Sequence, residues 1–100
     1  MHRTLAAIFL MTASASAQVI VDKPKGADDN LAKQIASDVA DQFTDPVSTQ
    51  IRRIRPSEDY EGSFCGEVNT KNQYGGYVGF KPFRYIVDRR KVYLVNSGCE

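Results

Sequence analysis

The two cysteines, Cys65 and Cys99, constrain this 100-residue chain more than any other feature. A small domain exported into an oxidising compartment is often held together by disulfides, so two cysteines in such a chain predict one bridge. The bridge would close a loop of about 35 residues, which the chain-entropy treatment places at about 3 to 4.7 kcal/mol of stabilisation. Because a core of this size contributes little, we expect the Cys65–Cys99 bridge to supply a large fraction of the stability.

The N-terminal residues predict the compartment that this bridge requires. A basic start, Met1-His2-Arg3, precedes an apolar block from Leu5 to Met11 and the small residues Ala15-Ser16-Ala17. This order is typical of a secretory signal peptide with an A-x-A cleavage signal. The apolar block is much shorter than the roughly 20 residues that cross a membrane. We therefore expect a signal peptide over residues 1–17, a single small domain over residues 18–100, a periplasmic or secreted location, and no membrane span after cleavage.

Charge and composition exclude several functions for residues 18–100. These residues carry 12 basic and 12 acidic side chains, because Arg3 is the only charged residue before them. Such a balance argues against nucleic acid as a partner, since phosphate backbones are bound by a cationic excess. The only histidine is His2, so no Ser-His or Cys-His dyad is available after residue 17.

The same inventory argues against metal and redox chemistry. Cys65 and Cys99 lack Cys-x-x-Cys spacing, and no histidine completes a zinc shell, which disfavours a redox-active pair or a metal site. We therefore expect no cofactor, no metal and no catalytic residue, and we expect that the protein is not an enzyme.

The segment before Pro46 predicts one amphipathic helix. Large apolar residues recur every four positions, at Leu31, Ile35, Val39 and Phe43. Alanines flank them, and polar side chains occupy the other half of the helical wheel. Asp28-Asp29-Asn30 offers capping groups, and Asp45-Pro46 ends the helix because the residue before proline avoids helical angles. Residues 19–27, which include Lys-Pro-Lys-Gly, predict a loose or extended lead-in.

Four segments after Pro46 predict short antiparallel strands. They are bounded by turn-forming residues, contain β-branched or aromatic side chains, and span residues 50–55, 63–71, 77–87 and 91–96. Pro82 cannot donate a ladder hydrogen bond, so we expect its strand to be an edge or bulged there. The predicted fold class is α+β, with the N-terminal helix packed on a curved antiparallel sheet of three or four strands and one disulfide.

The run CGEVNTKNQYGGYVGF, residues 65–80, is the strongest candidate for a site. Its asparagines and glycines tolerate positive φ angles, which predicts a turn between two strands. The run lacks the phosphate-binding pattern GxxxxGK[ST], and its aromatic spacing differs from that of the RNA-binding octapeptide. Its amides, lysine and tyrosines nevertheless exceed what a turn requires, and recognition often lies on loops. We therefore hypothesise a binding patch formed by Asn69, Lys71, Asn72, Tyr74 and Tyr77.

Two further sets of charged residues allow alternative interpretations of the function. Two carboxylates at a suitable separation suffice for glycoside hydrolysis, and the candidates are Glu58, Asp59, Glu61, Glu67 and Asp88. Glu67 would be the first acid to test. The run Arg52-Arg53-Ile54-Arg55 predicts a solvated or ion-paired outer face beside the nearby acids, with an anion or envelope contact as the alternative.

Two runs of the chain resemble a group of small exported proteins from proteobacteria and their phages. Asp45-Pro46-Val47-Ser48-Thr49-Gln50-Ile51-Arg52 is similar to their D-P-x-S-x-x-(F/I)-R segment, and residues 65–80 are similar to their CGEVNxKNxYGGYxGF block. The resemblance covers residues 45–83, and it implies export, small size and a single domain. It implies no activity and no catalytic residue.

Together these features predict a non-enzymatic binding domain. We expect its partner to be an envelope component, either a protein or a cell-wall polymer. The alternatives are a small carboxylate-dependent glycan hydrolase and an accessory protein that associates through a sheet edge.

Overall fold

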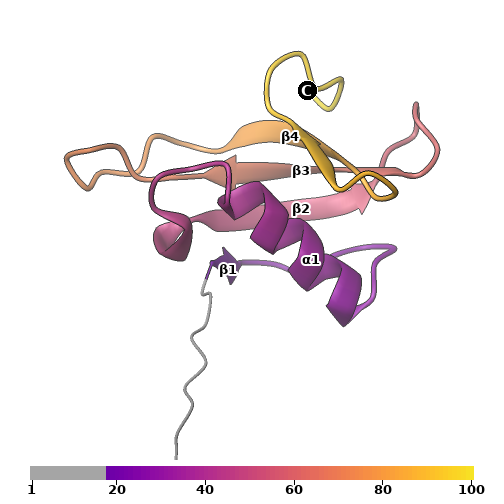
Figure 1. The fold of residues 1–100 in the computed structure, drawn as a ribbon, viewed down its shortest axis with the longest axis horizontal. Coiled ribbons are helices and arrows are strands. Elements are labelled where there is room, and N and C mark those ends of the chain that lie inside the picture. Colours follow the sequence, from indigo (N-terminus) through magenta and orange to yellow (C-terminus); the bar gives the residue numbers. More distant parts are fainter. Residues whose placement is uncertain (1–17) are drawn as a thin grey trace, which may run out of the picture.

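The computed structural model describes residues 18–100, in which one helix packs on one face of a five-stranded sheet (Figure 1). The α+β prediction is therefore confirmed at this level. The predicted signal peptide, residues 1–17, lies outside the described residues. Within residues 18–100 no helix has the length and apolar character needed to cross a membrane.

The sheet is mixed and has five strands, so the prediction of three or four antiparallel strands was wrong. Its elements in chain order are β1 (Val19–Ile20), α1 (Asp29–Ala40), the 3-10 helix η1 (Pro46–Ser48), β2 (Gln50–Pro56), β3 (Ser63–Asn69), β4 (Lys81–Ile86) and β5 (Lys91–Tyr93). The strands lie side by side in this order. Only β1 and β2 run parallel, whereas the other three pairs are antiparallel.

The additional strand comes from the segment predicted to be a loose or extended lead-in. Val19 N–H donates to Thr49 O and Val21 N–H donates to Ile51 O, both at 2.9 Å. A parallel partner requires a crossover connection, and α1 supplies it between β1 and β2. The Lys-Pro-Lys-Gly sequence therefore lies at the beginning of the crossover. The residues before it form a strand.

The helix begins as predicted but ends at Ala40, before the predicted end at Asp45-Pro46. Asp28 is the N-cap, and its side chain accepts from Leu31 N–H at 2.8 Å. After Ala40 the chain tightens, because Phe43 N–H donates to Ala40 O over only three residues. Asp45, predicted to end α1, instead caps η1 by accepting from Ser48 N–H at 3.3 Å.

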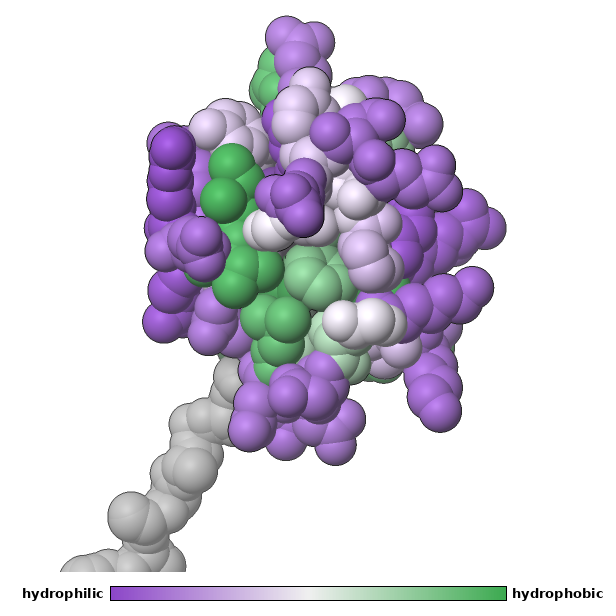
Figure 2. Space-filling view, turned by 90° about the vertical axis from the view of Figure 1, so that its right-hand side faces the viewer, coloured by the Kyte–Doolittle hydropathy of each residue, from purple (hydrophilic) through white to green (hydrophobic). Residues whose placement is uncertain are grey.

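The core lies between α1 and the sheet. Its buried members are Ile35, Ala36, Val39, Ile51, Ile54, Phe64, Val68, Phe83 and Tyr85. Figure 2 shows the end of the molecule at which α1 begins, where a strip of apolar residues is surrounded by hydrophilic side chains. Ala27, Leu31 and Val87 are partly buried and pack against the core.

A bulge in β2 allows two isoleucines to share the core. Ile51 and Ile54 are both fully buried although they lie three positions apart, and a regular strand places such residues on opposite faces. The register with β3 shifts between Arg52 and Arg55, and Arg53 adopts a φ of 59°. The extra residue therefore turns Ile54 inward and leaves Arg53 at the surface.

The C-terminal segment lies on the face of the sheet opposite α1. The predicted disulfide joins this segment to the sheet. Cys65 on β3 bonds to Cys99, their Cα atoms lie 5.6 Å apart, and both residues are buried. Neither cysteine of the chain is free. The predicted bridge is thus confirmed.

Pro82 lies where β4 has a neighbour on one side only. It faces Glu67 of β3, whereas the pairing of β5 with β4 extends only from Ile86 to Arg84. Pro82, which lacks an N–H, therefore lies at a local edge of the sheet, as expected.

Asp38 on α1 forms a polar network with the sheet. Tyr85 O–H donates to Asp38 Oδ2 and accepts from Gln34 Nε2, while Arg90 donates from two nitrogens to the two carboxylate oxygens at 2.8 Å each. The hydrogen bonds from Arg90 lower the pKa of Asp38 below its ordinary 3.8, and the bond from Tyr85 acts in the same direction against burial. Burial, together with Asp38, raises the pKa of Tyr85 above 10.0.

This network predicts a loss of stability in acid. Because the folded state lowers the pKa of Asp38, its contribution is present above about pH 4 and is lost as the pH falls through the folded value. In urea titrations from pH 3 to 7, Asp38→Asn is expected to cost about 1 to 2 kcal/mol near neutrality. That difference from the natural protein should shrink below pH 4.

A matched control is Asp41→Asn, at an exposed position whose carboxylate forms no ion pair within residues 18–100. An Asp38→Asn difference that stayed constant from pH 3 to 7 would contradict a role for the ionised carboxylate.

Candidate functional site

The predicted binding residues lie on an arm that extends β3 and β4 beyond the rest of the sheet (Figure 1). Regular pairing stops at Asn69, and a single bridge joins Lys71 to Tyr77. Gly75 N–H donates to Asn72 O at 3.0 Å, and Asn72 N–H donates to Gly76 O at 2.8 Å. The segment predicted to be a turn is therefore an ordered hairpin end.

Two of the five predicted residues hold this hairpin together. Asn72 Oδ1 accepts from Tyr74 N–H at 2.8 Å and from Gly76 N–H at 3.1 Å. Asn69 is buried, and its Oδ1 accepts from Gly79 N–H at 2.8 Å while its Nδ2 donates to Gln50 Oε1 at 3.1 Å. Their side-chain amides thus form local hydrogen bonds to the backbone and to β2.

The other three predicted residues present side chains near the surface. Tyr77 is anchored, because its O–H donates to Ser48 O at 2.8 Å and the Lys71 ammonium lies 5.4 Å from the centre of its ring. Tyr74 is 86% exposed. Its backbone is nevertheless fixed by Asn72, so the turn fixes the point from which the exposed ring projects.

A hollow of about 630 Å³ lies beside Tyr74. Its lining combines the hairpin with the chain before η1 and consists of Thr44, Asp45, Lys71, Asn72, Gln73 and Tyr74. The structure thus brings Lys71, Asn72 and Tyr74 to one hollow, whereas Asn69 and Tyr77 do not line it. Sequence reasoning missed Thr44, Asp45 and Gln73, and only Gln73 had a signal, because it lies within the polar run.

The acid singled out for hydrolysis, Glu67, is engaged by arginines. Its Oε1 accepts from Arg52 Nε at 2.6 Å, and its Oε2 lies 3.6 Å from Arg53 Nη1. The Arg52 guanidinium also stacks 3.8 Å from the centre of the Phe80 ring. This part of the arginine run is therefore ion-paired across β2 and β3.

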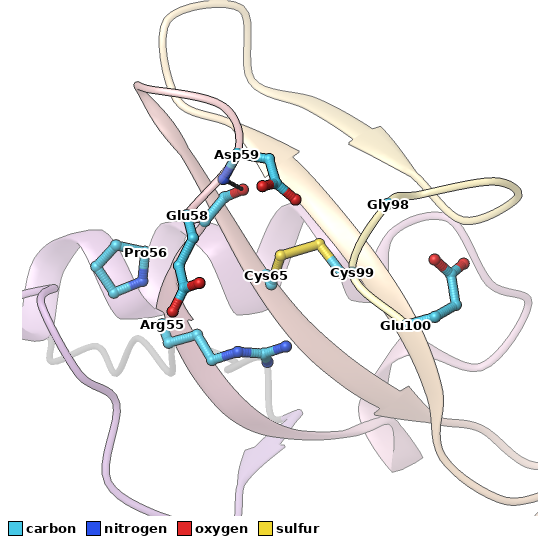
Figure 3. A pocket seen from close by; sticks show the side chains of 9 residues that line it. Arg55, Pro56, Glu58, Asp59, Cys65, Gly98, Cys99 and Glu100 are labelled. Carbon is cyan, nitrogen blue, oxygen red and sulfur yellow. Dashed lines mark hydrogen bonds between the residues drawn. A yellow bond between two sulfur atoms is a disulfide. The ribbon is translucent and has the colours of Figure 1, made fainter.

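A second hollow, of about 490 Å³, contains other acidic candidates (Figure 3). Glu58 and Asp59 border one side of it, Glu100 borders the other, and the Cys65–Cys99 disulfide lies between them. All three acids are exposed, and Asp59 N–H donates to Ser57 Oγ at 3.3 Å. Glu67 is not part of this lining.

The segment after β5 also covers Arg84, which the sequence did not single out. The Arg84 guanidinium lies 3.9 Å from the centre of the Tyr60 ring and 5.4 Å from that of Tyr93. Its buried Nε and Nη1 have no hydrogen-bond partner within residues 18–100. A Cβ on Gly98 would lie 3.5 Å from Nη1, so the tail packs directly on a cation that lies close to two aromatic rings.

In the part of the chain that the structure describes, no three His, Cys, Asp or Glu side chains are placed to hold a metal ion. Comparison with family models, curated proteins and solved structures found no match for this chain.

Proposed function

We propose that the protein is an exported, non-enzymatic binding domain whose hairpin end engages an envelope component, either a protein or a cell-wall polymer. The observation that carries this proposal is the placement of Tyr74, a largely exposed ring on a turn fixed by Asn72 beside a polar hollow. A tyrosine on a fixed turn offers a large contact area, and only its few side-chain torsions lose freedom on binding. Lys71 and Gln73 supply hydrogen-bond donors around it.

The rest of the chain is suited to serve as the scaffold that carries this hairpin. A disulfide-bonded domain suits an oxidising compartment, which agrees with the proposed export to the periplasm or the medium. The acids that would serve a hydrolase are either ion-paired, as Glu67 is, or exposed to solvent, as Glu58 and Asp59 are. None of these three acids is both unpaired and buried, the environment in which a carboxyl group serves as a general acid.

The proposal predicts that Tyr74→Ala weakens capture of the partner without weakening the fold. Truncation of a central aromatic contact typically costs about 1 to 2 kcal/mol or more, which corresponds to a loss of affinity of about 5- to 30-fold. The measurement is binding of the purified, disulfide-intact protein to envelope proteins and, separately, to purified cell-wall polymer. These two arms distinguish the two partner classes.

Val95→Ala is the matched control, because Val95 is also an exposed side chain, at 78%, but lies in the C-terminal segment. Thermal unfolding of both variants should match that of the natural protein. Equal capture by Tyr74→Ala and the natural protein would refute the hairpin site, and turnover of the polymer during the assay would refute the non-enzymatic assignment.

A further inference from the structure

A third hollow, of about 400 Å³, lies where the segment after β1 passes the β2 bulge. It is lined by Asp22, Lys23, Lys25, Arg53, Ile54, Arg55 and Glu67. Four of these residues are cationic and two are acidic, so the lining carries a formal excess of two positive charges. In residues 18–100 as a whole the side-chain charges cancel, which makes this excess a local feature.

Both acids of the hollow are already engaged. The two carboxylate oxygens of Asp22 accept from Arg53 N–H at 3.1 Å each. Glu67 accepts from Arg52 Nε at 2.6 Å, and Arg52 lies outside the lining. Lys23 and Lys25 are exposed and form no ion pair within the described residues, so their charges are uncompensated.

The bulge fixes the backbone of Arg53 beside this hollow. Arg53 has a φ of 59°, which is unfavourable for any residue other than glycine. Such backbone conformations cost on the order of 1 kcal/mol or more. Asp22 holds Arg53 in this conformation through its N–H, and Arg55 Nη1 donates to Arg53 O at 2.9 Å. The Arg53 side chain is 62% exposed, and only a 3.6 Å contact joins it to Glu67.

We propose that this cationic hollow binds a phosphate group, carried by a soluble phosphate ester or by a lipid headgroup. A phosphate dianion would neutralise the excess of two positive charges, whereas a single carboxylate would neutralise only half of it. Arginine binds phosphate oxygens through two parallel donors, and lysine adds a mobile point charge, so the two residue types complement each other here. The hollow shares no lining residue with the one beside Tyr74, so this inference is independent of the hairpin site.

The test is an amide NMR titration of the purified, disulfide-intact protein with inorganic phosphate and glycerol phosphate at constant ionic strength. Saturable shifts are expected around Asp22, Lys25 and Arg53. The double variant Lys23→Gln/Lys25→Gln should weaken binding about tenfold or more, because it removes two charged donors. Sedimentation with phosphatidic acid vesicles and with phosphatidylcholine vesicles forms the lipid arm, in which phosphatidic acid, a phosphate monoester, should be preferred if the source is a headgroup.

Lys33→Gln/Lys91→Gln is the charge-matched control, because both lysines are exposed and lie outside this lining. Arg53→Gly is a second variant that keeps the bulge, since glycine accepts the left-handed backbone, and it should also lose binding. Equal losses in the control and the Lys23/Lys25 variant, or identical shifts with chloride at the same ionic strength, would overturn the proposal. The absence of binding to phosphate, to its ester and to both vesicle types would overturn it as well.

Discussion

Replacing Cys65 and Cys99 with serine is expected to lower the free energy of unfolding by about 4 kcal/mol, the value that loop-closure entropy gives for a sequence separation of 34 residues. Small domains are stable by only about 5 to 15 kcal/mol, so a large part of this protein's stability would be lost. The change also releases the segment that covers Arg84, which lies under Gly98. Urea unfolding of the double variant at pH 7, followed by circular dichroism, measures the loss.

Reduction of the natural protein provides the internal comparison for this prediction. Treatment with a phosphine reductant should produce the same loss as the double serine variant, because both open the same loop. Val95→Ala should leave the free energy of unfolding within about 0.5 kcal/mol, since its side chain is exposed in the same C-terminal segment. A loss below about 1 kcal/mol in the double variant would show that the tail adds little to the fold.

The covalent link and the helix could be predicted from the sequence because each depends on a local or chemical signal. Two cysteines allow only one intramolecular pairing, and the capping aspartate Asp28 marks the start of α1 directly. Strand β1 could not be predicted in the same way. Its two residues pair with β2, which lies more than 30 positions further along the chain. The dipeptide Val19–Ile20 contains no pattern that identifies β2 as its partner.

The β2 bulge is an intermediate case. Isoleucines three positions apart in an extended segment conflict with the period of two, so Ile51 and Ile54 carried a signal that one residue must be extra. The position of that residue, Arg53, depends on Asp22, which comes from a different segment. The cationic hollow is therefore visible only when β1, its following segment and β2 are placed together.

The candidate hairpin site was predicted in position but not in the roles of its residues. An asparagine that binds a partner and an asparagine that holds a turn are identical in sequence, and the structure gives Asn69 and Asn72 hydrogen bonds of the second kind. Tyr74 differs, because its exposed ring forms none of the side-chain hydrogen bonds found in residues 18–100. Recognition is thus best tested at the tyrosine, and turn stability at the asparagines.

The contact between Gly66 and Phe83 predicts the second large effect. The two residues face each other across β3 and β4, and a Cβ on Gly66 would lie only 2.7 Å from Cε2 of the Phe83 ring. Phe83 is fully buried, so Phe83→Ala is expected to cost about 3 to 5 kcal/mol through lost burial and the cavity left behind. Gly66→Ala is expected to cost about 1 to 3 kcal/mol, because the ring has no free space into which to move.

A double-mutant cycle separates this contact from a general intolerance of the strand. In the Phe83→Ala background the new methyl group enters the vacated space, so Gly66→Ala should become neutral or stabilising there, with a coupling of about 1 to 3 kcal/mol. Gly76→Ala is the matched control, since a Cβ at Gly76 meets only Asn72 atoms at 3.9 Å. Chemical unfolding of the four members of the cycle gives the coupling. Additive losses would mean that the glycine is required by the backbone of β3 and not by the ring that lies across it.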